Sequence, residues 1–195
     1  ALLRERNNMN HHILKSTFVA ICILLTSLQS YGVDASKRGL EIAKALDQMD
    51  VGFHDQKVNM KMILRDRHNR ESSRTIRSQT FEVADDGDKT LIAFDHPRTV
   101  KGTKFLSYTH KAGSDDQWLF LPKLKRVKRI ASNNKSGPFM GSEFAYEDIS
   151  SQEVEKYTYK YIKDESCGSL QCHVVERYPV DKNSGYSKQI VWIVK

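Results

Sequence analysis

The sequence lacks the short motifs that commonly mark an active site. No serine lies in a G-x-S-x-G turn, no HExxH pair occurs, and no glycine-rich loop leads into a helix with a phosphate-binding lysine. The histidines are isolated in predicted turns and strand ends, and the adjacent Glu147 and Asp148 suit a cap or an ion pair better than a catalytic dyad. We therefore expect no catalytic residue, no metal and no cofactor, and an enzyme acting on lipid is the weakest functional hypothesis.

Cysteine is scarce, with three residues in the whole sequence. Cys22 follows Ile21 inside an apolar run, whereas lipid attachment needs a small residue before the cysteine. Cys167 and Cys172 are spaced CGSLQC in a predicted connection between strands, and an oxidising compartment would allow a disulfide there; two free thiols are the alternative. A redox or metal site is disfavoured, because a redox pair has two intervening residues rather than four and no histidine or acidic cluster accompanies these cysteines.

No apolar run reaches the roughly 20 residues of a membrane-spanning helix. The run at residues 18–28 follows a weakly basic head that starts at Met9, and it precedes the small-residue segment 33–35. This order is typical of a cleaved secretory signal, and a single-pass anchor is the alternative. We accordingly divide the sequence into an upstream extension or tag at 1–8, a signal peptide at 9–35, and one exported domain of the periplasm at 36–195.

Acidic residues are outnumbered by basic ones, 24 against 31, which gives a formal net charge of +7. Removing the predicted leader takes away three cations and two anions, so the charge falls to +6. A positive balance would favour nucleic acid as a partner in a cytoplasmic protein. An exported protein instead meets anionic lipid, whose surface attracts lysine and arginine at roughly 1 kcal/mol each. We therefore expect no nucleic-acid partner.

The predicted mature chain starts with one helix and continues with strands. A helix over 39–50, capped by Asp34 or Ser36, would carry a broad apolar face that includes Leu46 and Met49. Such a face is expected to pack on a sheet as part of the core. Alternation with a period of two then predicts strands joined by short connections, and hence an antiparallel meander. These strands are expected near 58–65, 75–84, 90–94, 104–110, 118–121, 123–130, 153–163, 173–178 and 186–194.

The stretch from 117 to 148 is the most informative part of the sequence. It starts with an apolar strand, continues with a basic segment, and then forms a long polar loop that ends in Phe139 and Met140. Exposed Phe and Met at the end of such a loop suggest a flap over an apolar ligand. The basic residues are expected to contact a lipid headgroup or a membrane near the rim of a cavity, and a solvated charged face is the alternative. They are Lys123, Lys125, Arg126, Lys128 and Arg129.

Four short motifs occur in order along the chain. The first contains Phe94, Pro97, Lys101, Gly102, Thr103, Phe105 and Leu106; the second Gln117, Trp118, Phe120, Leu121 and Pro122; the third Arg126, Val127, Arg129 and Ile130; the fourth Phe139 to Ser142, Phe144 and Tyr146 to Asp148. Together they resemble the signature region of the LolA-like outer-membrane lipoprotein-sorting proteins. The resemblance runs from about Leu40 to the end of the sequence. It implies an α+β fold with a single large curved antiparallel sheet, an open half-barrel with helices on its concave face. Because these relatives continue with further strands, we expect the sequence to be truncated at its C-terminus.

The resemblance implies a non-catalytic periplasmic carrier that binds lipid or lipoprotein acyl chains and delivers them toward the outer membrane. A sensor of the same fold, which detects lipid or lipoprotein and signals through a protein partner, is the alternative. Inner-membrane donor and outer-membrane acceptor proteins are possible partners, and we expect a monomer. The same apolar residues would form a sealed core if helices packed tightly on them. The residues expected to line the lipid cavity are Met60, Met62, Leu64, Phe81, Ile92, Phe94, Phe105, Trp118, Phe120, Phe139 and Met140.

Overall fold

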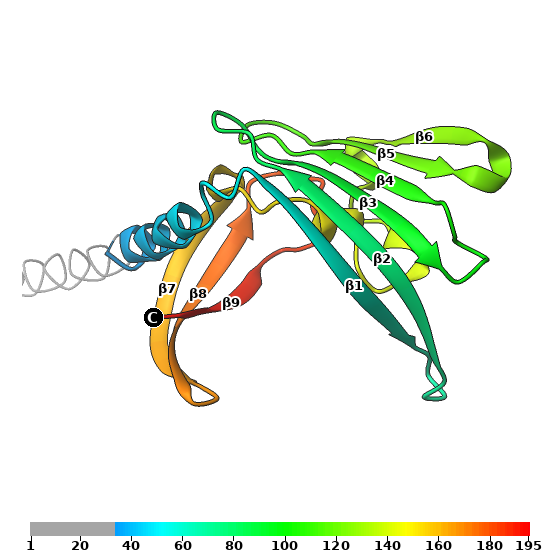
Figure 1. Ribbon diagram of the computed structural model, residues 1–195. Helices are drawn as coiled ribbons and strands as arrows, with labels where there is room; N and C mark the ends of the chain where they lie inside the picture. The colour runs from blue at the N-terminus through cyan, green and yellow to red at the C-terminus, as the bar shows by residue number, and fades with distance from the viewer. Residues whose placement is uncertain (1–33) are drawn as a thin grey trace, which may run out of the picture.

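The computed structural model describes residues 34–195 (Figure 1). Within this range a helix at 34–49 is followed by strands and short 3-10 turns. The strands are β1 (Asp55–Arg65), β2 (Glu71–Phe81), β3 (Lys89–His96), β4 (Lys104–Tyr108), β5 (Asp116–Leu121), β6 (Arg126–Ile130), β7 (Tyr157–Cys167), β8 (Leu170–Pro179) and β9 (Gln189–Val194). The 3-10 turns are η1 (Pro122–Leu124), η2 (Ser132–Asn134), η3 (Phe139–Gly141), η4 (Tyr146–Ile149) and η5 (Val154–Lys156).

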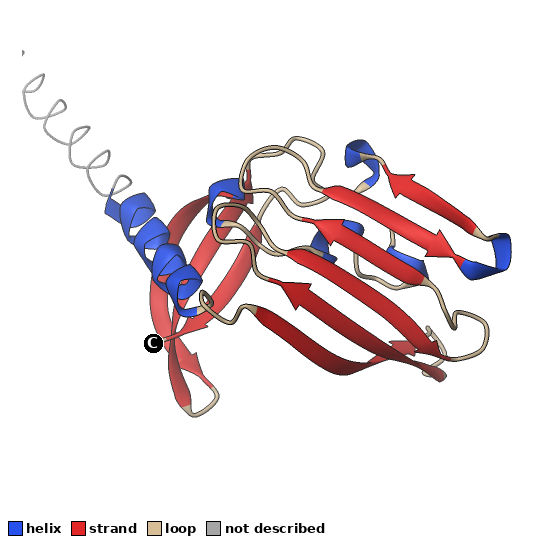
Figure 2. Ribbon diagram, turned by 45° about the horizontal axis from the view of Figure 1, so that its top comes forward, coloured by secondary structure: helices blue, strands red, loops and turns tan. Residues whose placement is uncertain are grey.

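The strands form two antiparallel sheets. The larger sheet has the order β1-β2-β3-β4-β5-β6 and the smaller sheet the order β7-β8-β9, so strands that pair within a sheet are always consecutive in the sequence. The two sheets diverge from each other, and the β6–β7 connection packs on the larger one (Figures 1 and 2). The predicted α+β class and open, curved antiparallel architecture are confirmed, although the strands are divided between two sheets instead of forming one.

The core lies on one face of the larger sheet, where the β6–β7 connection covers it. Phe139 of η3 is central to this core, because its ring lies 5.2 Å from that of Phe105 and 5.6 Å from that of Tyr146. Both contacts are edge-to-face, a favourable arrangement for aromatic rings. The buried core residues are Ile76, Ile92, Phe94, Phe105, Leu119, Ile130, Phe139 and Tyr146.

The helix at 34–49 packs closely on the smaller sheet. A glycine of the helix lies where its backbone approaches the backbone of β7. A Cβ atom on Gly39 would lie 2.8 Å from the backbone nitrogen of Tyr161, so no side chain fits there. The guanidinium group of Arg38 stacks on the ring of Tyr161, 3.8 Å from its centroid, and lies 3.7 Å from the carboxylate of Asp164. These contacts fix the helix on β7.

The helix differs from the prediction in its start and in its buried face. Residues 34–49 are helical, so both predicted capping residues lie inside the helix. Leu46 and Met49 are 49% and 82% exposed, whereas Ala43 is buried. The predicted signal peptide, except for residues 34 and 35, falls outside the described residues, and its cleavage stays a prediction. Among residues 34–195, no helix has the length and apolar character needed to cross a membrane.

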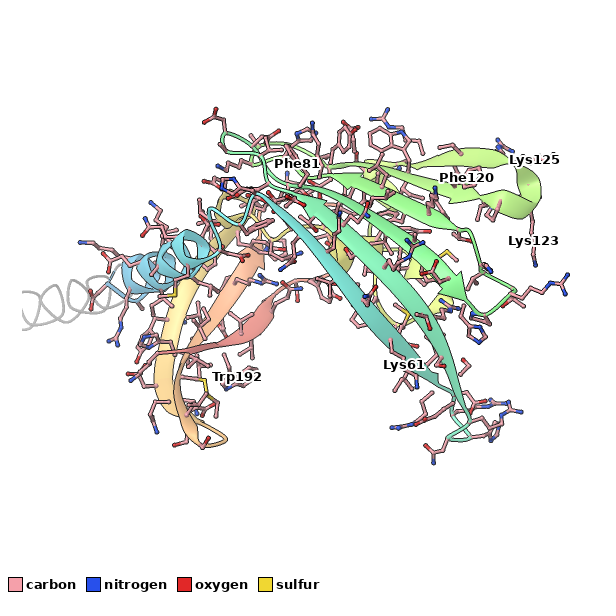
Figure 3. The ribbon with its side chains drawn as sticks, viewed as in Figure 1. Lys61, Phe81, Phe120, Lys123, Lys125 and Trp192 are labelled. Atoms are coloured by element: carbon pink, nitrogen blue, oxygen red, sulfur yellow. A yellow bond between two sulfur atoms is a disulfide. The ribbon has the colours of Figure 1, made fainter. Side chains whose placement is uncertain are left out.

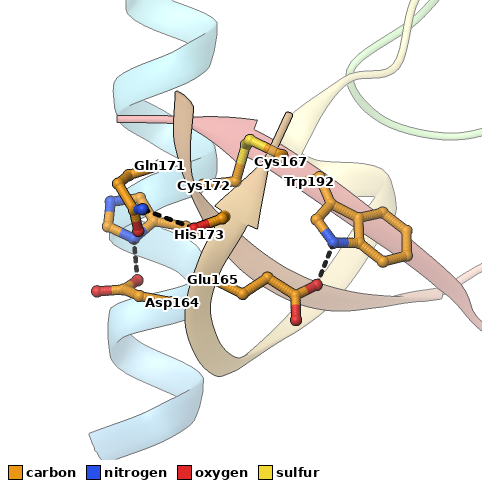
Figure 4. The surroundings of a disulfide bond; sticks show 8 residues. Asp164, Glu165, Cys167, Gln171, Cys172, His173 and Trp192 are labelled. Atoms are coloured by element: carbon orange, nitrogen blue, oxygen red, sulfur yellow. Dashed lines mark hydrogen bonds and ion pairs between the residues drawn. A yellow bond between two sulfur atoms is a disulfide. The ribbon is translucent and has the colours of Figure 1, made fainter. Parts of the chain in front are cut away.

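A disulfide between Cys167 and Cys172 closes the turn between β7 and β8, with 5.9 Å between the two Cα atoms (Figure 4). Closing so short a loop contributes about 2 kcal/mol in the chain-entropy description. The same sheet is also tied by side chains, since the indole N–H of Trp192 donates to Glu165 at 2.6 Å. The covalent link therefore supports the end of the sheet that lies away from the β6–β7 connection.

Candidate functional site

A cavity of about 730 Å³ opens where the helix, the β2–β3 connection, the segment before β7 and the smaller sheet meet. Its volume lies within the roughly 300–1,000 Å³ of ligand sites in proteins. Apolar side chains form much of its lining. These are Ala43, Leu46, Met49, Val51, Phe53, Val83, Ala84, Val154, Tyr159, Val191, Trp192 and Ile193.

The linker between the helix and β1 is held in place by a carboxylate. Glu82, directly after β2, accepts hydrogen bonds from the backbone N–H groups of Gly52 at 2.5 Å and His54 at 2.7 Å. These bonds hold the pKa of Glu82 below its usual range. They also fix the two apolar residues of the linker, Val51 and Phe53, at the mouth of the cavity.

A histidine joins the β2–β3 connection to the β4–β5 connection. The Nδ1 atom of His110 lies 2.6 Å from Asp86, and its Nε2 atom lies 3.4 Å from Asp116. Asp86 also accepts the backbone N–H of Lys111 at 2.9 Å. The hydrogen bond from His110 lowers the pKa of Asp86 to about 2, and the same bond raises the pKa of His110. Two loops of the cavity wall are thereby linked through one imidazolium group.

This link predicts pH-dependent stability. Because the pKa of folded His110 is raised by Asp86, its contribution is complete below the unfolded value of about 6.5 and is lost as the pH rises through the folded value. We expect the free energy of unfolding, measured in urea, to decrease between about pH 6 and pH 9 by an amount that His110→Asn abolishes. His68→Asn, in the exposed β1–β2 turn, is the control. An unchanged pH profile in His110→Asn would contradict this role.

Carboxylates make up much of the polar lining of the cavity. The acidic residues are Asp47, Asp50, Glu82, Asp86, Asp88 and Glu153, and the basic residues are Lys111 and Arg177. Glu153 is only 8% exposed, and no group among residues 34–195 donates a hydrogen bond to its carboxylate or forms an ion pair with it. Burial raises the pKa values of Glu153 and of Asp88. The cavity therefore combines an apolar lining with carboxylates, and one of them, Glu153, belongs to a residue that is only 8% exposed and has no side-chain partner among the described residues.

A second cavity, of about 450 Å³, lies where the β4–β5 and β6–β7 connections meet the smaller sheet, and most of its charged side chains have partners. Lys135 donates to Asp181 at 2.7 Å. Glu147 accepts hydrogen bonds from the turn at 184–185 at 2.7 and 2.8 Å. Asp148 caps η4 by accepting the preceding backbone N–H at 2.7 Å. These polar groups join the connections of the two sheets, so we assign this cavity a structural role.

A solved structure has the same fold as this chain, and more than half of the aligned residues are identical. That structure is of an outer membrane lipoprotein-sorting protein domain from Vibrio parahaemolyticus. It is 54% identical to this chain, with a TM-score of 0.80, and the match covers 82% of this chain and 68% of that chain. The chain belongs to the LolA-like family of outer-membrane lipoprotein-sorting proteins.

Two further solved structures resemble this LolA-like chain. A DUF1329 family protein from Desulfovibrio piger is 30% identical, with a TM-score of 0.76, over 83% of this chain and 69% of that chain. A LolA superfamily protein from Nitrosomonas europaea is 19% identical, with a TM-score of 0.56, over 82% of this chain and 66% of that chain, and it supports the shared fold alone. A family described as an uncharacterized protein matches residues 86–195. No curated protein matches the chain.

Strand register in this LolA-like chain separates three aromatic residues from the other predicted lipid-binding residues. Trp118 pairs with Leu106, one position away from the buried Phe105. Because side chains alternate along a strand, Trp118 and Phe120 point away from the core face. Phe81 points to the same outer face (Figure 3). The expectation that these three residues share an inner surface with Phe105 is therefore corrected.

The remaining predicted residues lie on the core face or beside it, but none of them lines either cavity. Met62 and Met140 pack at the edge of the core, and Leu64 is half-buried; only Met60, on the edge strand β1, is 40% exposed. For this part of the sheet, the structure corresponds to the sealed-core alternative. Four of the predicted residues are at most 5% exposed, namely Ile92, Phe94, Phe105 and Phe139.

The basic segment lies on the β5–β6 hairpin, at the end of the larger sheet that is distant from the helix (Figure 3). The predicted strand begins later than expected, because Pro122 opens η1 and Lys125 adopts a left-handed conformation with φ 46°. The basic side chains are exposed but do not reach the rim of the 730 Å³ cavity. They are Lys123, Lys125, Arg126, Lys128 and Arg129.

Sequence patterns did not reveal the residues that line the 730 Å³ cavity, because most of them lie in connections and at element ends. A periodic pattern identifies the faces of long elements, not the surroundings of loops. One signal was available. The apolar residues Leu46, Met49, Val51 and Phe53 continue past the end of the helix into the linker, where no core position is predicted.

Proposed function

We propose that this LolA-like protein is a non-catalytic carrier of the cell envelope. It binds lipid or lipoprotein acyl chains in the 730 Å³ cavity and delivers them toward the outer membrane. The observation that carries the proposal is an apolar cavity whose lining is left open: Leu46 is 49%, Val51 68% and Trp192 53% exposed. Each methylene group transferred from water into such a site contributes about 0.8 kcal/mol, so a single acyl chain would supply a large binding energy.

The relatives support this proposal, since one of them is described as a domain of an outer membrane lipoprotein-sorting protein. Membership in this family also supports a site of action in the envelope. The β5–β6 hairpin would then dock on an anionic membrane. Its basic side chains are accompanied by two exposed apolar ones, Leu124 at 68% and Val127 at 58%, a combination that suits the surface of a bilayer.

Retention of lipid by the purified protein tests the proposal. We expect organic extraction and mass spectrometry to find lipid bound to the wild-type protein. Replacing both Leu46 and Met49 with glutamine should reduce the bound lipid at least about tenfold, because two apolar side chains are lost from the cavity wall. Their exposure means that thermal unfolding should change little.

The matched control replaces Ile63 and Leu170 with glutamine, since both are exposed apolar residues away from the cavity, at 55% and 53%. This variant should retain lipid as the wild type does. Absence of lipid from the wild-type protein, or equal retention by both double variants, would contradict the proposed site. Retention without transfer to acceptor membranes would indicate a sensor instead of a carrier.

A further inference from the structure

The charge of the 730 Å³ cavity is opposite to that of the protein. Its six carboxylates and two basic side chains give a formal charge of −4 when all are ionised, in a chain of net charge +7. One of the two cations is already engaged, because Arg177 lies 4.5 Å from the ring centroid of Tyr157 and donates to Gln189 at 2.7 Å. The lining therefore favours a ligand that carries positive charge.

Glu153 is the residue of the lining at which a positively charged group would bind. Its side chain lies in the wall of the cavity directly before η5, where the residue is more than nine-tenths buried. The nearest lysine in the sequence, Lys156, pairs with Asp115 instead. Partial desolvation without a partner disfavours the charged form of this carboxylate, so a cationic ligand at this position would stabilise the charge.

Asp88 lines the same cavity and lies within electrostatic reach of Glu153. Burial is the main reason for the raised pKa of Glu153, and the charge of Asp88 adds to it. Among the described residues, the carboxylate of Asp88 accepts only one long hydrogen bond, from the backbone N–H of Val83 at 3.3 Å. Two carboxylates with free acceptor positions thus face the same space.

We propose that Glu153 and Asp88 bind the primary ammonium group of a lipid headgroup whose acyl chains occupy the apolar part of the cavity. A primary ammonium group has three N–H donors, so it can donate to more than one carboxylate oxygen of the lining. A metal ion fits less well, because no group of three potential ligands comes together within residues 34–195. The inference rests on the proposed function and names the headgroup class that the carrier selects.

The test uses the full protein and mixed vesicles that contain equal amounts of phosphatidylethanolamine, phosphatidylcholine and phosphatidylglycerol with identical acyl chains. Protein-bound lipid is separated from the vesicles and identified by mass spectrometry. We expect phosphatidylethanolamine to exceed phosphatidylglycerol by about tenfold or more, the effect of a charge-assisted hydrogen bond. Glu153→Gln and Asp88→Asn should each reduce this preference severalfold. Glu155→Gln, an exposed neighbour, should leave it unchanged.

The outcomes separate this inference from the proposed function. Lipid bound without preference for phosphatidylethanolamine, or a preference unaffected in both variants, overturns the inference and leaves the carrier intact. Equal binding of phosphatidylcholine overturns the primary-amine assignment, because its quaternary group has no N–H donor. If the wild-type protein binds none of the three lipids, the proposed function itself fails. Thermal unfolding of each variant verifies folding, and two independent substitutions keep the test decisive if one does not fold.

Discussion

Replacing Phe139 with alanine is expected to lower the free energy of unfolding by about 3–5 kcal/mol, as for large aromatic residues in protein cores. The side chain is 1% exposed and lies against the rings of Phe94, Phe105 and Tyr146. Its removal would leave a cavity in the centre of the interface between the larger sheet and the β6–β7 connection. Urea unfolding of the purified variant measures the loss.

The control is Phe144→Ala, because Phe144 belongs to the same connection and is 52% exposed. Its substitution should change stability by less than about 1 kcal/mol, as is usual for surface positions. Comparable losses in the two variants would contradict the assignment of Phe139 to the core. The sequence had suggested a flap at this position, in which case stability would hardly change and only lipid retention would decrease.

Replacing Gly39 with leucine is expected to detach the helix from the smaller sheet and to abolish lipid retention. Leucine is a better helix former than glycine by about 1 kcal/mol, so propensity alone would stabilise the helix. The new Cβ atom would instead lie 2.8 Å from the backbone of Tyr161, and a backbone neighbour cannot rotate away. Such overpacking typically costs about 1–3 kcal/mol or more.

Hydrogen exchange over residues 34–49, followed by mass spectrometry, reports the detachment directly. Exchange should become fast in Gly39→Leu while the strands of the larger sheet keep their protection. Lys44→Leu introduces the same side chain at an exposed helix position and should leave both exchange and lipid retention unchanged. Normal protection of the helix in Gly39→Leu would show that Gly39 does not determine docking.

The regular elements of this fold were predictable from sequence, and the cavity was not. Alternating side chains located the strands but did not show which of the two alternating sets faces the core. In β5 the buried set includes Leu119, whereas the neighbouring Trp118 faces outward. The prediction placed Trp118 on the inner face because it is large and apolar. The hydrophobicity of a residue does not reveal how its strand is aligned with the neighbouring strand. Phe139 was misplaced for a related reason, since a polar loop gives no indication that a sheet will receive its aromatic side chain.

The site itself depends on pairs of residues that are distant in sequence. Glu153 and Asp88 line one cavity only because the fold brings the segment before η5 and the β2–β3 connection together. Neither residue belongs to a motif, and each alone would be interpreted as a solvated surface carboxylate. Burial and the lack of a partner distinguish Glu153, and both are properties of the folded chain.

The attachment of the helix through one glycine contact and one stacked arginine has a consequence for kinetics. Only Gly39 and Ala43 are buried among residues 34–49, so brief separation of the helix from the sheet requires only a small part of the total stability. Cargo would enter during these separations, and the loading rate would follow how often they occur instead of how often vesicles collide with the protein. In the proposed carrier, both uptake and release of cargo would then depend on this weakly held element.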